Sequence, residues 1–352
     1  MDKPAERRCR TIVVGVGRAG SNVVSQLMNI GITGADCIAV DTDTQSLNMV
    51  RATHKVIIGG EITQGLGTGG NPAVGRTAIQ ESKKRLGNLL KDRDIAFIVA
   101  GLGGGTGTGA APIVAEIARR KGSIVIGVVT TPLKTEKRRI QCAAHGLTEM
   151  RKKCDTVIVI DNNKLVESAP RVRLSEALRV VNQVSANTIK EIIESTMMPS
   201  LINLNLADFK TLVARGGVAA VGFGESDAPN RAEEAVRNAI RSQLHDVDFA
   251  GAKGALIQVS GDDHLTIEEV DKVGEIVKGM MQNNATVVWG ARVNPNLAGM
   301  LRVTLLLAGI NSPRRLGEIG TVTRELFDID PCTERGEISK IDLNLDQIED
   351  FE

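Results

Sequence analysis

The sequence reads GGGTGTG from Gly103 to Gly109, and no other part of the chain is as informative. This run follows an apolar segment at 95–100 and precedes a helical pattern at 110–120. Six of the nine residues from 101 to 109 are Gly, which costs backbone entropy and is tolerated where the backbone must approach something closely. Successive N–H groups at a helix N-terminus cradle anionic oxygens, and the two Thr hydroxyls add donors. The run therefore predicts a phosphate-binding loop.

Two further glycine-rich segments have the same setting. GVGRAG at 15–20 lies between a strand pattern and a helix pattern, and Asp41 follows about twenty residues later. GLGTGGNP at 65–72 again ends where a helix begins. Three anion-binding loops at one edge of a parallel sheet suit a triphosphate better than a dinucleotide. The chain contains no GxxxxGK[ST] motif, so we do not predict a P-loop enzyme.

The first of these segments leaves two alternatives open. Its GxGxxG spacing with Asp41 also fits an NAD-binding oxidoreductase, and a tight strand-to-helix turn would need the same glycines for packing. The oxidoreductase interpretation explains neither the run at 103–109 nor the polar segment at 203–208.

The predicted fold class is α/β. Continuous apolar strands that alternate with helices through the first half of the chain indicate a doubly wound parallel sheet, covered on both faces. An uninterrupted helical pattern at 174–195 would be roughly 33 Å long, and a smaller α/β unit with a mixed sheet follows it. We predict a nucleotide-binding domain at 1–173, a central helix at 174–199, an activation domain with a catalytic loop at 200–310, and a flexible C-terminal tail at 311–352.

Composition narrows the function further. The net charge is +1 and the aromatic residues are six Phe and one Trp, which argues against a nucleic-acid partner. Five scattered Cys without a CxxC pair predict reduced thiols and no zinc site. No apolar run approaches the ~20 residues that span a bilayer, and the start has no signal-peptide core. We therefore expect a cytoplasmic protein that does not insert directly into a membrane.

The run at 103–109 matches GGGTG[ST]G, the signature of the tubulin superfamily, and residues 10 to 310 resemble the FtsZ family, in particular its archaeal members. The resemblance implies a tubulin-like fold, binding of GTP and GDP with Mg²⁺, hydrolysis of GTP, and head-to-tail polymerisation at the site of cell division. It assigns no protein metal ligand. The residues that it places at the nucleotide are Gly17, Gly20, Ser21, Asn22, Asp43, Gly67, Thr68, Gly69, Gly103, Gly104, Gly105, Thr106, Gly107, Thr108, Glu136, Arg139, Asn162 and Asn182.

The choice of base can also be argued from chemistry. An Asn amide offers a donor and an acceptor, so it can match the edge of guanine, and such a site rejects analogues that leave its groups unpaired. The resemblance assigns this role to Asn182, with Leu178 where the family has Phe. The alternative is that Asn182 belongs to a solvated helix face.

Beyond the far end of the long helix the sequence reads INLNLADFK at 202–210. The helix separates Asp208 from the glycine loops by most of a domain width, so this carboxylate can reach only the nucleotide of a neighbour stacked head to tail. Stacking of that kind generates a filament when it does not close.

The family pattern NxDxxD appears here with Asn205 in place of its first acid, and the resemblance implies catalytic roles for Asp208 and Asn205. An amide orients water but cannot accept its proton, so we assign the polarising role to Asp208 and expect slow turnover. The same substitution fits an alternative function, a GTP-binding filament scaffold or cell-shape paralogue with little hydrolysis.

The chain ends in IDLNLDQIEDFE, in which Ile341, Leu345 and Ile348 stand among acidic residues. This pattern suits an amphipathic helix that docks in a groove. The resemblance implies that the tail binds a membrane-tethering division protein. A solvated tail without a partner is equally compatible with the sequence.

Overall fold

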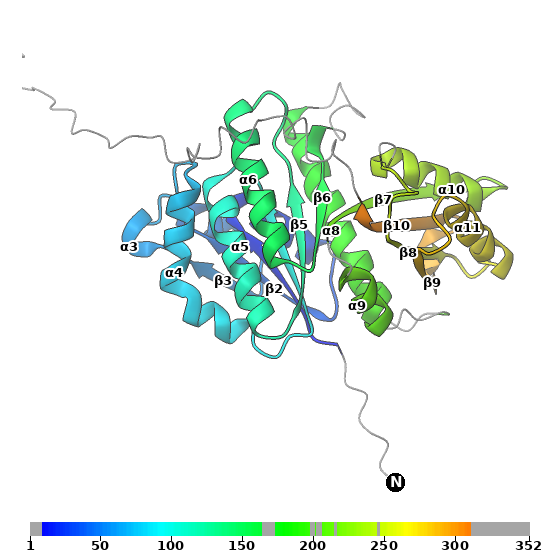
Figure 1. The fold of residues 1–352 in the computed structure, drawn as a ribbon, viewed down its shortest axis with the longest axis horizontal. Coiled ribbons are helices and arrows are strands. Elements are labelled where there is room, and N and C mark those ends of the chain that lie inside the picture. Colours follow the sequence, from blue (N-terminus) through cyan, green and yellow to red (C-terminus); the bar gives the residue numbers. More distant parts are fainter. Residues whose placement is uncertain are drawn as a thin grey trace, which may run out of the picture.

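Ten strands form one sheet in the order β3-β2-β1-β4-β5-β6-β7-β10-β8-β9 (Figure 1). The computed structural model describes residues 9–163, 173–197, 201, 206–214, 217–244 and 247–310. The strands are β1 Thr11–Val16, β2 Ala35–Asp41, β3 His54–Ile57, β4 Ile95–Gly101, β5 Ile124–Thr130, β6 Thr156–Ile160, β7 Val218–Ser226, β8 Gly254–Gly261, β9 Thr286–Val293 and β10 Leu301–Ile310. The helices are α1 Gly17–Asn29, α2 Thr44–Met49, α3 Gly60–Thr63, α4 Pro72–Leu89, α5 Gly105–Arg120, α6 Lys137–Lys153, α8 Leu174–Met197, α9 Leu206–Ala214, α10 Arg231–Ala239 and α11 Ile267–Gly279.

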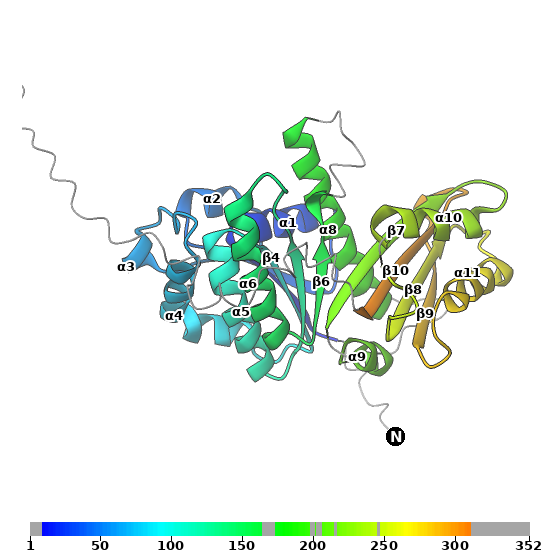
Figure 2. The ribbon, with the colours of Figure 1, turned by 45° about the horizontal axis from the view of Figure 1, so that its top comes forward.

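Successive side chains of each strand point to opposite faces of the sheet, so the sheet carries two hydrophobic cores. Ile12 and Val14 of β1 belong to the core covered by α4, α5, α6, α10 and α11. Val13 belongs to the other core, which packs against α1, α8 and α9. Figures 1 and 2 show α4, α5 and α6 side by side over one face. The arrangement confirms the predicted doubly wound fold class.

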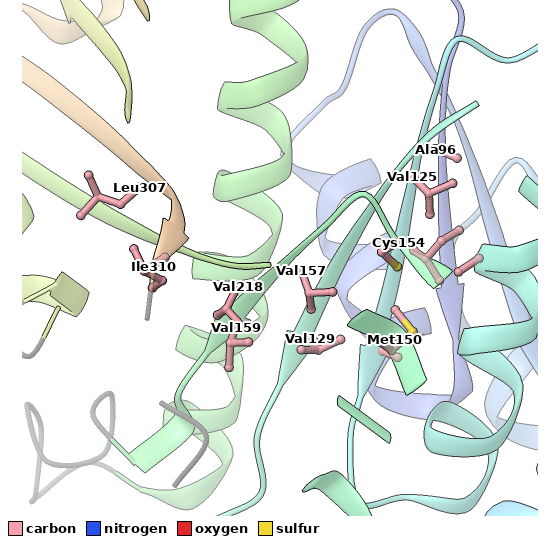
Figure 3. Packing of buried hydrophobic residues seen from close by; sticks show 14 of the residues in the cluster. Ala96, Val125, Val129, Met150, Cys154, Val157, Val159, Val218, Leu307 and Ile310 are labelled. Atoms are coloured by element: carbon pink, nitrogen blue, oxygen red, sulfur yellow. The ribbon is translucent and has the colours of Figure 1, made fainter. Parts of the chain in front are cut away.

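The two halves of the molecule share this one sheet. β6 pairs in parallel with β7 through Val157 and Ile158, which lie opposite Val218 and Ala219, and Figure 3 shows this junction from close by. β10 runs antiparallel to both of its neighbours, β7 and β8, so the second half is mixed, as predicted. The sequence did not predict the junction, because a pairing between segments that are distant along the chain leaves no local pattern.

Helix α8 lies at the boundary between the halves (Figures 1 and 2). It has 24 residues, which corresponds to a length of roughly 36 Å. Its buried residues Ile189, Ile192 and Ile193 pack in the second core. The predicted central helix is therefore confirmed, whereas the domain boundaries at 173, 199 and 310 stay predictions. The tail at 311–352 lies outside the described residues.

Several local predictions need correction. α1 begins at Gly17 and α5 at Gly105, so Gly20 and the segment 105–108 lie in helices and not in the preceding loops. Asp208 lies in the first turn of α9, where we had expected a loop. Helix α6 was not predicted, because its charged ends obscure a short apolar stripe.

Candidate functional site

A cavity of about 620 Å³ opens at the carboxyl ends of β1, β2, β4 and β5, the edge at which α/β sheets bind ligands. It brings together most of the residues that the sequence placed at the nucleotide. Those that line it are Gly17, Gly20, Asn22, Asp43, Gly67, Thr68, Gly69, Gly104, Gly105, Thr106, Gly107, Glu136, Arg139, Asn162 and Asn182. Ser21, Gly103 and Thr108 lie behind the lining. The N–H of Gly103 donates to the Thr108 hydroxyl at 2.9 Å, a contact that holds the loop before α5.

Several glycines of the run at 105–109 are required for packing within the protein. A Cβ added at Gly109 would lie 2.0 Å from the carbonyl oxygen of Pro72, and one at Gly107 would lie 2.6 Å from that of Gly101. One at Gly105 would lie 2.2 Å from the Thr68 hydroxyl. These contacts are far shorter than any real Cβ contact, so only Gly lets α5 approach its neighbours. The expectation that the run serves ligand approach alone is therefore incomplete.

Hydroxyl groups join the glycine segments at the base of the cavity. The hydroxyls of Thr42, after β2, and Thr106, on α5, lie 2.7 Å apart and form a buried hydrogen bond. The hydroxyl of Thr68, from the segment before α4, lies 3.4 Å from that of Thr106. Three segments that are distant in sequence thus present donors to the same cavity.

Three buried polar atoms at this edge have no hydrogen-bond partner among the described residues: Ser21 Oγ, Asp41 Oδ2 and Asn162 Oδ1. Asp41 and Asn162 line the cavity. A buried polar atom without a partner costs about 1–3 kcal/mol. Burial also raises the pKa of Asp41, although its Oδ1 accepts from the N–H of Thr42 at 2.8 Å. A ligand that brings donors or a cation would satisfy the atoms of Asp41 and Asn162.

Arg18 and Ser46, which the sequence analysis did not single out, hold Asp43 in place. Arg18 pairs with the Asp43 carboxylate at 2.7 Å, and the N–H of Ser46 donates to it at 3.0 Å. Hydrogen bonds from the Ser46 backbone and hydroxyl, helped by Arg18, lower the pKa of Asp43 from 3.8 to about 2. Arg18 lines the cavity. It occupies a variable position of GxGxxG, where a single sequence carries no signal.

The start of α6, which packs beside Gly103, carries an ion pair at the cavity. Arg139 lies 2.5 Å from the carboxylate of Glu136, which also accepts from the N–H of Leu133 at 3.1 Å. Both charged residues line the cavity, as does Asn162 at the end of the following strand. The pair places one acceptor and one cation at the start of α6.

Helix α8 forms another part of the cavity wall. Leu178, Val181 and Asn182 line it. Leu178 is half-exposed, with 49% of its surface accessible, so it offers an aliphatic surface beside the amide of Asn182. This combination suits a flat heterocycle with a polar edge.

Asp208 is not at this cavity. It is exposed, in the first turn of α9, and α9 follows the far end of α8. Asn205 lies outside the described residues. Within the described parts of the chain no group of three or more His, Cys, Asp or Glu side chains could hold a metal ion.

Together these features describe an α/β protein with a cavity lined by three glycine segments and a long helix, which is the arrangement of the tubulin-like class. The description "Tubulin/FtsZ family, GTPase domain" matches residues 10–170, and "FtsZ family, C-terminal domain" matches residues 217–311. The chain belongs to the FtsZ family, whose members are polymerising cytoskeletal GTPases of cell division.

Individual relatives agree with this assignment. "Cell division protein FtsZ 2" of Methanocaldococcus jannaschii is 45% identical over 88% of this chain and 82% of its own length. "Cell division protein FtsZ 1" of Thermococcus kodakarensis is 44% identical over 88% of this chain and 83% of its own length. The solved "FtsZ dimer, empty (M. jannaschii)" superposes with a TM-score of 0.83 at 42% identity, covering 87% of this chain and 89% of that one.

A second set of structures shares the fold alone. CetZ2 from Haloferax volcanii, solved as a "GTPgS bound protofilament", has a TM-score of 0.78 at 23% identity and covers 91% of this chain and 98% of its own. The FtsZ relatives are about twice as similar in sequence. The relatives named above at 44–45% identity are cell division proteins, so the cell-shape or scaffold alternative is not favoured.

Proposed function

We propose that the chain binds GTP in the cavity at the sheet edge and hydrolyses it in a site that the next subunit completes with Asp208. One observation carries this proposal: the exposed carboxylate of Asp208 lies beyond α8, whose length is roughly 36 Å, while the phosphate-binding segments lie at its other end. A residue so placed can act only on the nucleotide of a stacked neighbour.

The cavity supports a division of roles along the nucleotide. The N–H groups at the start of α5 and the hydroxyls of Thr68 and Thr106 would hold the phosphates. Glu136 and Arg139 would contact the ribose region, and Asn182 would read the base while Leu178 packs on its face. Each role rests on the position of the residue in the cavity lining.

Mg²⁺ fits the residues at this site. The free Oδ2 of Asp41 is one buried carboxylate oxygen at the cavity, and Mg²⁺ usually binds through one or two carboxylates together with phosphate oxygens. Asp41 would hold the ion with the nucleotide. When bound, Mg²⁺ neutralises charge on the β- and γ-phosphates.

In the assembled site Asp208 would accept a hydrogen bond from the attacking water and orient it toward the γ-phosphorus. Asn205 would orient the same water without accepting its proton. The rest of the rate enhancement would come from positioning and charge neutralisation in the cavity. Hydrolysis is then coupled to assembly, because neither subunit holds the full site.

Complementation between two variants tests the shared site. Asp208→Ala retains the nucleotide cavity, and Asn182→Ala weakens it but retains Asp208. Neither variant alone should hydrolyse GTP at the wild-type rate, whereas a mixture above the assembly concentration should regain turnover. Asp208→Asn, which keeps the shape and removes the charge, is the matched control. If mixing the two variants gave no gain in GTP turnover, the site would lie within one subunit.

A simpler measurement tests assembly. The rate per subunit should rise with protein concentration, in step with GTP-dependent pelleting. A constant rate per subunit across that range would contradict a site formed at the joint.

The location and partners follow from the same assignment. We propose that the filaments act in the cytoplasm at the division site, and that residues 341–352 bind a membrane-tethering division protein. No helix in the described parts of the chain is long and apolar enough to cross a membrane. Deleting 341–352 should leave GTP turnover in solution intact and abolish localisation in cells.

A further inference from the structure

Three basic triplets lie on neighbouring helices of one face. They are KKR at 83–85 on α4, RRK at 119–121 at the end of α5, and RKK at 151–153 at the end of α6. We call these nine residues the basic face. Eight of the nine side chains are exposed, and Lys153 is half-buried.

Direct contacts show that the triplets are contiguous. The Cε of Lys121 on α5 lies 3.5 Å from the position of a Cβ at Gly87 on α4, so the lysine stem lies across that helix. On the other side, Arg119 donates to the carbonyl oxygen of Lys152 on α6 at 3.4 Å. The α5 triplet therefore connects the other two.

A single carboxylate at the centre confirms this closeness. Glu116 on α5 pairs with Lys153 at 2.9 Å and with Arg120. The hydrogen bond from Lys153, together with the charges of Arg120 and Lys83, lowers the pKa of Glu116. All three triplets thus act on one carboxylate.

The nine cations of the basic face outnumber the carboxylates that pair with them, and stabilisation of helix C-termini does not account for all of them. Among the described residues, the carboxylates that pair with the nine cations are Glu116, Glu149 and Asp155. Cations stabilise the last turn of a helix, but the α4 triplet precedes its last turn, which has no basic residue. Like charges on packed helices repel one another, so the face attracts an anionic partner.

The chain contains a segment of matching charge. Residues 311–352 carry eleven acidic and five basic residues, a net −6, so residues 1–310 carry +7 within the total of +1. The last twelve residues, 341–352, have five acidic residues and no basic one.

The sheet topology brings the start of this tail to the basic face. Because β10 is antiparallel, Ile310 pairs with Val218 at the beginning of β7, and Val218 pairs with Val157. Ile310 is thus two strand spacings, about 10 Å, from Val157, and Val157 is four residues after Lys153 (Figure 3). The 30 residues 311–340 separate Ile310 from the acidic end, and a chain of that length that behaves as a random coil spans about 30 Å on average, which is enough to reach all three triplets.

We propose that the acidic end of the tail, residues 341–352, docks on the basic face of its own subunit. Tethering gives the segment an effective concentration in the millimolar range, which favours it over free anions. The same segment carries the apolar residues assigned above to a tethering partner, so the docked state and the partner compete for it. The docking itself does not depend on nucleotide or on hydrolysis.

Zero-length carbodiimide cross-linking of the full chain with GDP tests the proposal, because the reagent joins Lys only to carboxylates in contact. An equal mixture of ¹⁵N-labelled and unlabelled protein shows which subunit supplies the tail. We expect cross-links from 341–352 to lysines of the basic face. In each cross-linked peptide pair, both peptides should be unlabelled or both ¹⁵N-labelled, because both come from one subunit. Raising the salt from 0.1 to 1 M shortens the Debye length from about 10 to 3 Å, and the yield should fall about tenfold.

Matched variants provide the control. The double variant Lys84→Glu with Arg151→Glu should lose the cross-links. The control double variant, Arg241→Glu with Lys278→Glu, makes the same charge change at exposed residues elsewhere and should retain the cross-links. The proposal would be overturned if the tail cross-linked evenly to lysines outside the basic face. It would also be overturned if the cross-links were unchanged in Lys84→Glu with Arg151→Glu. Mixed light–heavy pairs would overturn it in favour of a second copy. Sedimentation with phosphatidylglycerol vesicles that needs the basic face, without tail cross-links, would replace the tail with a lipid surface.

Discussion

Asp41, the last residue of β2, and Asp43 stand two positions apart, yet their surroundings shift their pKa values in opposite directions. Asp41 is buried with one oxygen unpartnered among the described residues, which raises its pKa. Asp43 accepts hydrogen bonds from Ser46 and pairs with Arg18, which lowers its pKa to about 2. The first carboxylate is therefore the better candidate for contact with a cation, and the second has a structural role as the N-cap of α2.

Asp43→Ala should lower the free energy of unfolding by about 1 kcal/mol at pH 7, because α2 loses its cap. A lowered pKa means that the carboxylate stabilises the fold above its ordinary value of 3.8, and that this contribution is lost as the pH falls through about 2. Urea unfolding at pH 7, 5 and 3 should show a constant difference between wild type and variant at the two higher values and a smaller one at pH 3. A difference that stays the same or grows at pH 3 would contradict this assignment.

Asn182→Ala should weaken GTP binding about three- to tenfold, as expected for the loss of one hydrogen bond. The sharper measurement compares GTP with ITP, which lacks the 2-amino group. Wild type should prefer GTP, and the variant should lose that preference. Leu178→Ala is the control, because it removes packing on the base without touching its edge. Equal discrimination in wild type and Asn182→Ala would move base reading to another residue.

At the scale of elements, α5 shows how one sequence signal can have two causes. Its glycines allow the helix to approach α4 and the end of β4, and they also leave backbone N–H groups at the cavity. The close contacts of Gly109 are with Pro72 and Arg76 of α4, and Gly109 does not line the cavity. Part of the glycine signature therefore reflects helix packing.

Gly109→Ala should destabilise the fold by about 1–3 kcal/mol, because the added methyl group would overlap the carbonyl of Pro72. Gly87→Ala on α4 is the matched control, since its nearest neighbour is the flexible end of Lys121 at 3.5 Å. The control should be neutral or stabilise the helix by up to about 1 kcal/mol. Comparable losses in the two variants, measured by urea unfolding, would show that the contact with Pro72 is not the cause.

At the scale of the whole molecule, buried ion pairs join α8 to the second half of the chain. Arg292 of β9 pairs with Glu194 at 2.7 Å, and only 12% and 10% of their side-chain surfaces are exposed. Arg302 of β10 pairs with Glu191 at 3.2 Å. These residues line a second cavity of about 670 Å³ beside α8. Since α8 also lines the cavity at the sheet edge, these pairs connect one wall of that cavity to the second half of the chain.

Arg292→Met should destabilise the protein by about 3 kcal/mol, because among the described residues it leaves the buried carboxylate of Glu194 paired with Lys190 alone, at 3.7 Å. Adding Glu194→Met should restore part of the loss, since two apolar residues can replace a buried pair. A double-mutant cycle from urea unfolding measures this coupling. If the losses of unfolding free energy in the two single variants add up to the loss in the double variant, within about 0.5 kcal/mol, the pair does not act as a unit.

The glycine segments and the alternation of strands and helices sufficed to predict the fold class, the meeting of the glycine segments at one sheet edge and the central helix, because each leaves a local pattern of residue types. The sequence alone did not reveal that the halves share one sheet, that Gly109 packs on Pro72, or that three basic triplets meet on one face. Each of these depends on which distant segments lie side by side. Such neighbours are decided by packing and strand pairing in three dimensions, and periodicity along the chain does not record them.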